Sequence, residues 1–294
     1  MNVFAILTDP DNAIELTEKN YNRFTKRDFP YVQHNANNEP SAYAICPECQ
    51  NPIRLINRNV DSTESKTFYA RHHCFSVPHL ANYDQDAYED CQLANPHRFD
   101  GKVRRKPGQK TDHIKQVFLN NIDLIITTLE QEMGIKLSDS TIENMIADFC
   151  KTKGYEYRAV GIHNLPLAFA YMTEAQNLLG CVIKGNIAEA INQQSHYFEA
   201  IKGRYGIDSY LLHRKPKTSR SSLKFFFSEH SIPKGNNQNN ESVQMHIIEI
   251  ESNQLPENAP IIFSRQIKID ATKFQNTIKR REKLRSIIRR YLDR

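Results

Sequence analysis

The chain has 294 residues, of which 39% are apolar and 25% are charged, and its formal net charge is +5. This length and composition suit one large or two ordinary folded domains and exclude an intrinsically disordered chain. No run of 18 apolar residues occurs and the first residues lack a basic signal-peptide segment, so we expect a cytoplasmic protein without a membrane span.

Residues 1–110 form the first predicted domain, a small zinc-binding module. This segment is rich in Asn, Tyr and His and has few long apolar periods, so we expect an irregular chain that builds little core of its own. Four of the six cysteines lie between positions 46 and 91, whereas Cys150 and Cys181 lie in apolar surroundings. In a cytoplasmic chain such clustering favours metal binding over disulfides.

Two of the expected zinc ligands are Cys46 and Cys49, which are separated by Pro47 and Glu48. A two-residue spacing lets both thiolates face one ion. We favour His72 and Cys91 as the other ligands, because His72 ends a short predicted strand and Cys91 lies in a separate turn. The remaining candidates for these two positions are His73, Cys74, His79 and His97.

A structural role for this zinc is favoured over a catalytic one. Glu48 lies inside the knuckle, the segment from Cys46 to Cys49, but no His-x-Glu motif of the zinc deaminases accompanies the cysteines. A redox role of the Cys-x-x-Cys pair is a further alternative, yet no strand–helix pattern of the thioredoxin type surrounds it. The plainest alternative is a pair of incidental cysteines beside a His-rich loop. The structural role is favoured because metal binding would supply the folding free energy that a segment with a small core lacks.

The second predicted domain, residues 111–294, follows a loop rich in Gly, Pro and basic residues. Three helices are expected first, at residues 112–129, 140–153 and 166–179. Strands are then expected at residues 155–160, 209–213, 223–229, 243–249 and 260–269, before a last helix at 271–292. This order predicts an α+β fold with a mainly antiparallel sheet.

The last predicted helix carries the positive charge of the chain. Residues 272–294 contain nine Lys and Arg but two acidic residues, which leaves the rest of the chain with a net charge of −2. The helix either docks its apolar stripe on the sheet with a solvated cationic face, or turns that face toward phosphates. The candidate nucleic-acid-binding residues are Arg104, Arg105, Lys106, Arg280, Arg281, Arg285 and Arg289.

Residues 43–119 resemble the N-terminal part of the competence protein CoiA family, whose members have a zinc ribbon followed by a nuclease-like domain. The resemblance rests on the knuckle from Ala44 to Cys49, the aromatic segment from Phe68 to His72 and the helix start from Asp112 to Lys115. The segment from Ile248 to Ser252 is similar to the family's strand with an acidic metal ligand. The resemblance implies a Mg²⁺-dependent nuclease, with candidate acids Glu249, Glu251 and Asp270 and a candidate lysine, Lys268.

The sequence shows no Gly-rich phosphate loop and no nucleophile elbow. We therefore expect a zinc-stabilised accessory protein that holds a nucleic acid or an acidic protein partner, in a bacterial system that handles DNA or defends against foreign DNA. It would be a subunit of a larger complex. The alternatives are the CoiA-like nuclease and a purely structural subunit.

Overall fold

The computed structural model describes residues 1–34, 38–56, 68–101, 103–203, 206, 208–216, 221–232, 241–251, 254–255 and 258–292. The chain divides into two compact units. Unit 1 comprises Met1–His97, Ile232–Asn240 and Asp270–Arg294, and unit 2 comprises Arg98–Ser231 and Glu241–Ile269. Both contain helices and antiparallel sheets, so the α+β prediction is confirmed.

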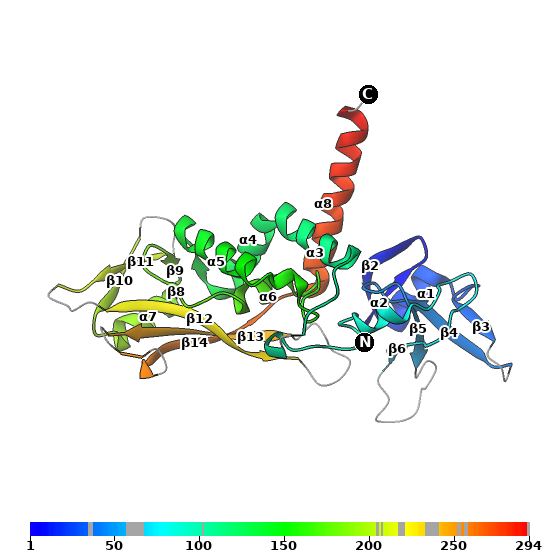
Figure 1. Ribbon diagram of the computed structural model, residues 1–294, viewed down its shortest axis with the longest axis horizontal. Coiled ribbons are helices and arrows are strands. Elements are labelled where there is room, and N and C mark those ends of the chain that lie inside the picture. Colours follow the sequence, from blue (N-terminus) through cyan, green and yellow to red (C-terminus); the bar gives the residue numbers. More distant parts are fainter. Residues whose placement is uncertain are drawn as a thin grey trace. The chain divides into compact units, whose positions relative to one another are not determined.

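Unit 1 is built on an antiparallel sheet of six strands in the order β2-β1-β4-β5-β6, with β3 paired to β4 (Figure 1). The strands are β1 (Val3–Ile6), β2 (Asp9–Glu15), β3 (Val32–His34), β4 (Pro40–Ile45), β5 (Pro52–Ile56) and β6 (Tyr69–His72). Its helices are α1 (Glu18–Thr25), α2 (Gln85–Glu89) and α8 (Ala271–Leu292).

The expectation that the N-terminal segment builds little core of its own is wrong. One face of the sheet packs around Phe4, Tyr21 and Ile53, all fully buried, and the other around Tyr43 and Val77. Strand β4 lies between these two clusters and is buried on both faces. It therefore lacks the alternation of apolar and polar residues that would mark a half-exposed strand.

Only the first half of α8 packs against unit 1. Phe274 and Ile278 are buried, and the Asn276 side chain donates a hydrogen bond to the carbonyl of Ala13 at 3.3 Å. Further along, the apolar residues Leu284 and Ile288 are 47% and 55% exposed. The helix thus extends beyond these buried residues, and its second half carries the exposed residues Leu284, Ile288 and Arg289.

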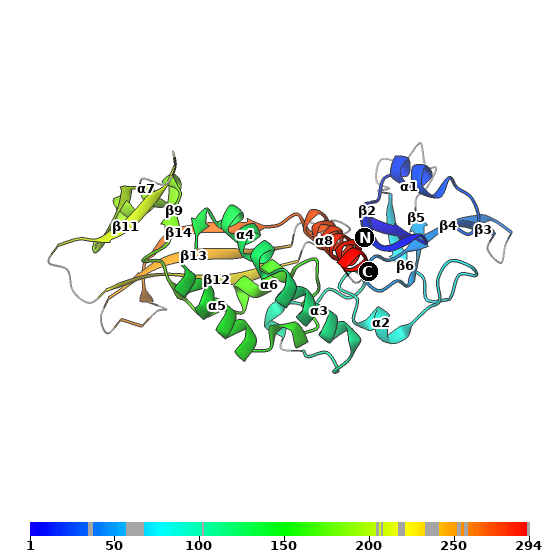
Figure 2. The ribbon, with the colours of Figure 1, turned by 90° about the horizontal axis from the view of Figure 1, so that it is seen from above.

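Unit 2 contains two four-stranded sheets, β14-β13-β12-β8 and β10-β11-β9-β7. Its strands are β7 (Ile135–Lys136), β8 (Gln176–Asn177), β9 (Val182–Ile183), β10 (Phe198–Lys202), β11 (Tyr210–Arg214), β12 (Ser222–Ser231), β13 (Ser242–Ile250) and β14 (Ile261–Lys268). Its helices are α3 (Gln109–Asn120), α4 (Ile122–Met133), α5 (Asp139–Lys151), α6 (Leu165–Tyr171) and α7 (Gly185–Gln194), with short 3₁₀ turns η1 (Phe99–Gly101) and η2 (Gly154–Glu156). Figure 2 shows α4, α5 and α6 over the sheet of the longer strands.

Most expected elements of unit 2 are present. The expected helix at 140–153 is α5, which Ser138 caps by accepting a hydrogen bond from the Thr141 amide. The four later strands agree with the prediction, and so does the last helix, which belongs to unit 1. Helix α7 and strand β10 were not expected, although α7 buries Ile187, Ala188 and Ile191 at helical spacing and β10 buries the alternate residues Phe198 and Ala200.

Three elements depart from expectation. The helix expected at 112–129 breaks at the buried Asn121, whose side-chain amide donates to the Val117 carbonyl at 3.0 Å. The helix expected at 166–179 ends at Tyr171. The segment expected as a strand at 155–160 instead forms the end of η2, a single β-bridge at Tyr157 and a turn. It directs the carbonyls of Tyr155, Arg158 and Val160 at the buried guanidinium of Arg105.

A candidate Cys3His metal centre

The turn between β4 and β5 presents Cys46 and Cys49. The Cys46 amide donates to the Asn51 carbonyl and the Gln50 amide donates to the Cys46 carbonyl, both at 2.9 Å. Gln50 closes the turn in the left-handed conformation, with φ of 57°. This backbone directs both sulfur atoms toward one point.

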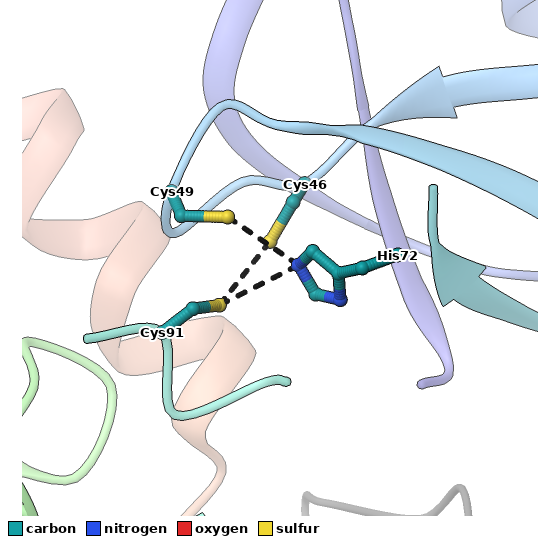
Figure 3. A group of neighbouring side chains, drawn as sticks. All are labelled: Cys46, Cys49, His72 and Cys91. Atoms are coloured by element: carbon teal, nitrogen blue, oxygen red, sulfur yellow. Dashed lines mark hydrogen bonds between the residues drawn. The ribbon is translucent and has the colours of Figure 1, made fainter. Parts of the chain in front are cut away.

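The other two members come from separate segments of unit 1. His72 is the last residue of β6, where it pairs with Ile53 of β5. Cys91 lies in the turn after α2, and its amide donates to the Tyr88 carbonyl at 3.1 Å. Figure 3 shows the three sulfur atoms and the His72 ring converging.

The geometry of the four donor atoms suits a tetrahedral ion. All four lie within 4.8 Å of one another. The Cys46 and Cys91 sulfur atoms are 3.7 Å apart, and the His72 Nε2 atom lies 3.3 Å from the Cys49 sulfur and 3.6 Å from the Cys91 sulfur. Tetrahedral zinc with ordinary bond lengths would separate two sulfur ligands by roughly 3.8 Å and a sulfur from a nitrogen by roughly 3.6 Å. The chain therefore has a Cys3His cluster that could hold a metal ion such as zinc.

The electrostatics of the cluster link the ionisation of its thiols to the presence of a cation. Burial raises the pKa of the Cys46 and Cys91 thiols well above the usual value. Hydrogen bonds, chiefly from Cys46 and Cys91, lower the pKa of Cys49. The cluster by itself thus favours one thiolate at Cys49, and three thiolates side by side require a divalent cation to offset their repulsion.

Two polar side chains tie the knuckle to the segment that carries Cys91. Glu48 accepts hydrogen bonds from the amides of Gln92 and Leu93, both at 3.1 Å. The fully buried Asn51 donates to the Asp84 carbonyl at 2.9 Å and accepts from the Asp84 amide. Both sets of hydrogen bonds fix the position of Cys91 relative to the knuckle. They give Glu48 a structural task, and the only sequence signal for Asn51 is its place two residues after Cys49.

Replacing Glu48 by alanine is expected to loosen the Cys91 turn. The amides of Gln92 and Leu93 would no longer have a charged acceptor, at a cost of about 1–3 kcal/mol in the free energy of unfolding. Metal affinity should fall by about 10- to 100-fold, as it does for residues that orient ligands. Chelator competition and thermal unfolding measure both effects. Glu89→Ala, which removes an exposed carboxylate of α2, is the matched control; equal behaviour of the two variants would contradict this role.

The four other ligand candidates lie outside the cluster. The ring of His73 packs on Tyr43, with centroids 5.4 Å apart, and Cys74 is exposed. The ring of His79 packs on Phe29 at 5.3 Å. The amide of His97 donates to the Gln92 side chain. The described residues that come together are thus the two knuckle cysteines, His72 and Cys91.

The basic candidate residues are found in two different settings. In unit 2, Arg105 is buried and donates to three carbonyls, and Arg104 forms an ion pair with Glu156 at 2.9 Å, whereas Lys106 is exposed. In unit 1, Arg280, Arg281, Arg285 and Arg289 follow the docked part of α8, where Arg280 and Arg289 are exposed. Arg105 therefore serves the packing of unit 2 and is not available to a phosphate.

The acidic candidates of unit 2 do not form a second metal cluster within the described residues. Glu249 is buried and accepts hydrogen bonds from the Ser195 hydroxyl and from the amides of His196 and Tyr197. Glu251 accepts from the Tyr197 hydroxyl at 2.8 Å. Asp270, in unit 1, accepts from the Lys273 amide at the start of α8, and Lys268 is exposed on β14.

Comparison with family models, with curated proteins and with solved structures found no match. Among the described helices, none has the length and apolar character needed to cross a membrane.

Proposed function

We propose that the chain is a zinc-stabilised binding protein without chemistry of its own, and that the zinc holds a ribbon-like module in unit 1. The observation that carries this proposal is the closed set of four donors. Three thiolates and one imidazole at tetrahedral separations suit Zn²⁺ and fill its coordination shell, which leaves no position for a reactive water. The ion would join β6 and the Cys91 turn to the knuckle.

The proposed partner is a nucleic acid held by the second half of α8. Packing of Phe274 and Ile278 fixes the beginning of this helix on unit 1, and the arginines beyond them lie along the part in which Leu284 and Ile288 are exposed. A cationic helix gains affinity for a duplex by releasing the counterions condensed on its phosphates. An acidic protein surface is the alternative partner for the same charges.

A charge-removing variant tests this role of α8. In the tail variant, Arg280→Gln, Arg281→Gln, Arg285→Gln and Arg289→Gln are combined, and Phe274 and Ile278 stay in place. We expect a labelled 20-base-pair duplex to bind at least tenfold more weakly, and the slope of log K against log salt to fall by about 0.9 for each phosphate that the variant no longer neutralises. Fluorescence anisotropy at several salt concentrations measures both.

The control removes the same number of charges elsewhere. Lys19, Lys136, Lys151 and Lys202 are exposed and can be replaced together by glutamine. If this control and the tail variant show equally reduced affinity, the tail makes no specific contribution. If the unmodified protein fails to bind the duplex at low salt, the acidic protein partner becomes the better proposal.

A setting in bacterial DNA handling or defence against foreign DNA, as an accessory subunit, is part of the proposal and derives from the CoiA resemblance. The nuclease alternative derives from the same resemblance. The three hydrogen bonds that Glu249 accepts support a structural task for that carboxylate. Binding is therefore the function that we favour.

A further inference from the structure

Strands β5 and β6 have two faces with different chemistry. Ile53, Leu55 and Ala70 point into the buried core, on the side where His72 joins the metal cluster. Because side chains alternate along a strand, Arg54 and Arg71 lie on the opposite face. The metal centre thus anchors two strands whose other face carries two arginines.

Arg54 and Arg71 are direct partners across the antiparallel pair. Side chains in this position start about 5 Å apart, and two like charges there destabilise the sheet. Arg54 donates to the Ser41 hydroxyl at 3.2 Å, and neither arginine has an ion pair with a carboxylate in the described part of the chain. Arg71 is exposed. The pair is therefore a place where a bound anion would be stabilising.

Aromatic rings lie next to this pair. Tyr43 of β4 is the cross-strand partner of Arg54, and its ring packs on His73 at 5.4 Å. The ring of His73 in turn packs edge-on against Phe75 at 5.7 Å, and Phe75 is 67% exposed.

A second exposed ring, Phe29 in the turn after α1, packs on the segment that follows β6. Phe29 is 64% exposed and packs on His79 at 5.3 Å. The Gln33 side chain donates to the carbonyls of Pro30 and Pro78, at 2.8 and 2.9 Å, and so holds the Phe29 turn against the residue before His79. Phe29 and Phe75 are thus each backed by a histidine ring and open to solvent.

We propose that unit 1 binds single-stranded nucleic acid on an arginine–aromatic surface made of Phe29, Arg54, Arg71, His73, Phe75 and His79. The two arginines take a backbone phosphate, and the exposed faces of Phe75 and Phe29 stack on unpaired bases. Rings that stack on bases combined with a cationic track for the backbone are the general means of binding single strands. A duplex offers no unstacked base to these rings, so the surface discriminates against it.

This inference deepens the proposed function, because it rests on nucleic acid as the partner, but it assigns the selectivity for single strands to a different part of unit 1 from α8. Both arginines can meet one phosphate, whose geometry suits guanidinium groups. The zinc on the opposite face would hold β5 and β6 in register, and thereby Arg54 opposite Arg71. Removal of zinc should therefore weaken single-strand binding although no ligand of the ion touches the nucleic acid.

The test compares a fluorescein-labelled 12-residue oligodeoxythymidylate with a duplex by anisotropy at about 50 mM salt, a concentration at which phosphate contacts are strong. Phe75→Ala with Phe29→Ala should weaken binding of the single strand about tenfold or more and leave duplex binding unchanged. Phe75→Tyr should keep the affinity, because tyrosine retains the ring. Arg54→Gln with Arg71→Gln should weaken single-strand binding and lower its salt dependence.

Leu119→Ala is the matched control, because Leu119 is an apolar residue of unit 2 with 66% exposure. Each variant is checked for an unchanged melting temperature and zinc content. If the Phe75 and Phe29 variant binds the single strand as Leu119→Ala does, or if the unmodified protein does not bind it, the inference is wrong. Weaker binding in the tail variant alone would support the proposed function against this inference, and weaker binding in the surface variants alone would do the reverse.

Discussion

A Cys91→Ser chain is expected to lose its zinc and much of the stability of unit 1. The serine hydroxyl is a poor zinc ligand, and the remaining donors, Cys46, Cys49 and His72, would leave a buried thiol, a thiolate and an imidazole close together without an ion between them. Structural zinc contributes on the order of 10 kcal/mol to the folding of small modules, so the loss of one ligand should cost several kcal/mol. Thermal unfolding with and without a chelator measures it.

Cys74→Ser is the matched control for this experiment. Cys74 lies two residues after His72 in the sequence but is exposed and outside the cluster. The Cys74→Ser protein should therefore keep both the zinc content and the melting temperature of the unmodified protein. If the Cys91→Ser protein had the same melting temperature and zinc content as the Cys74→Ser protein, Cys91 would not be a ligand.

Replacing Glu249 by alanine is the second change with a large expected effect. The carboxylate is 2% exposed and accepts three hydrogen bonds from residues 195–197, which lead from α7 into β10. Its removal would leave buried donors without an acceptor, and we expect a loss of about 3 kcal/mol or more in the free energy of unfolding. Denaturant titration followed by circular dichroism would measure this loss.

Two comparisons separate this structural role from a nuclease role. Glu251→Ala removes a more exposed carboxylate with one hydrogen bond and should cost below about 1 kcal/mol. Glu249→Gln keeps the side-chain length and one acceptor oxygen, so it should cost less than alanine. If Glu249→Gln left stability unchanged but abolished Mg²⁺-dependent cleavage of plasmid by the unmodified protein, Glu249 would be catalytic and our account of unit 2 would fail.

Local patterns in the sequence were sufficient for part of the fold. The spacing of Cys46 and Cys49 belongs to one turn, and Ser138 precedes a helix with a regular apolar face. Strands β12 and β13 are long enough for their aromatic and β-branched residues to identify them as strands. In each case the information lies within a few neighbouring residues, which is the range over which such patterns act.

What could not be predicted depends on interactions between distant residues. Glu48 meets Gln92 and Leu93 more than forty positions later, and Arg105 reshapes a segment about fifty residues away. The six strands of unit 1 are short and β4 is buried on both faces, so no alternation marks it. The break at Asn121 depends on a buried side chain within a continuous apolar pattern.

Metal content and coordination of the purified protein test the central claim most directly. Elemental analysis should find one zinc ion per chain, and X-ray absorption at the zinc edge should show three sulfur neighbours at about 2.3 Å and one nitrogen neighbour at about 2.0 Å. A metal-free protein that is folded and whose melting temperature is unchanged by chelator would contradict the claim, and so would a zinc ion surrounded mainly by oxygen.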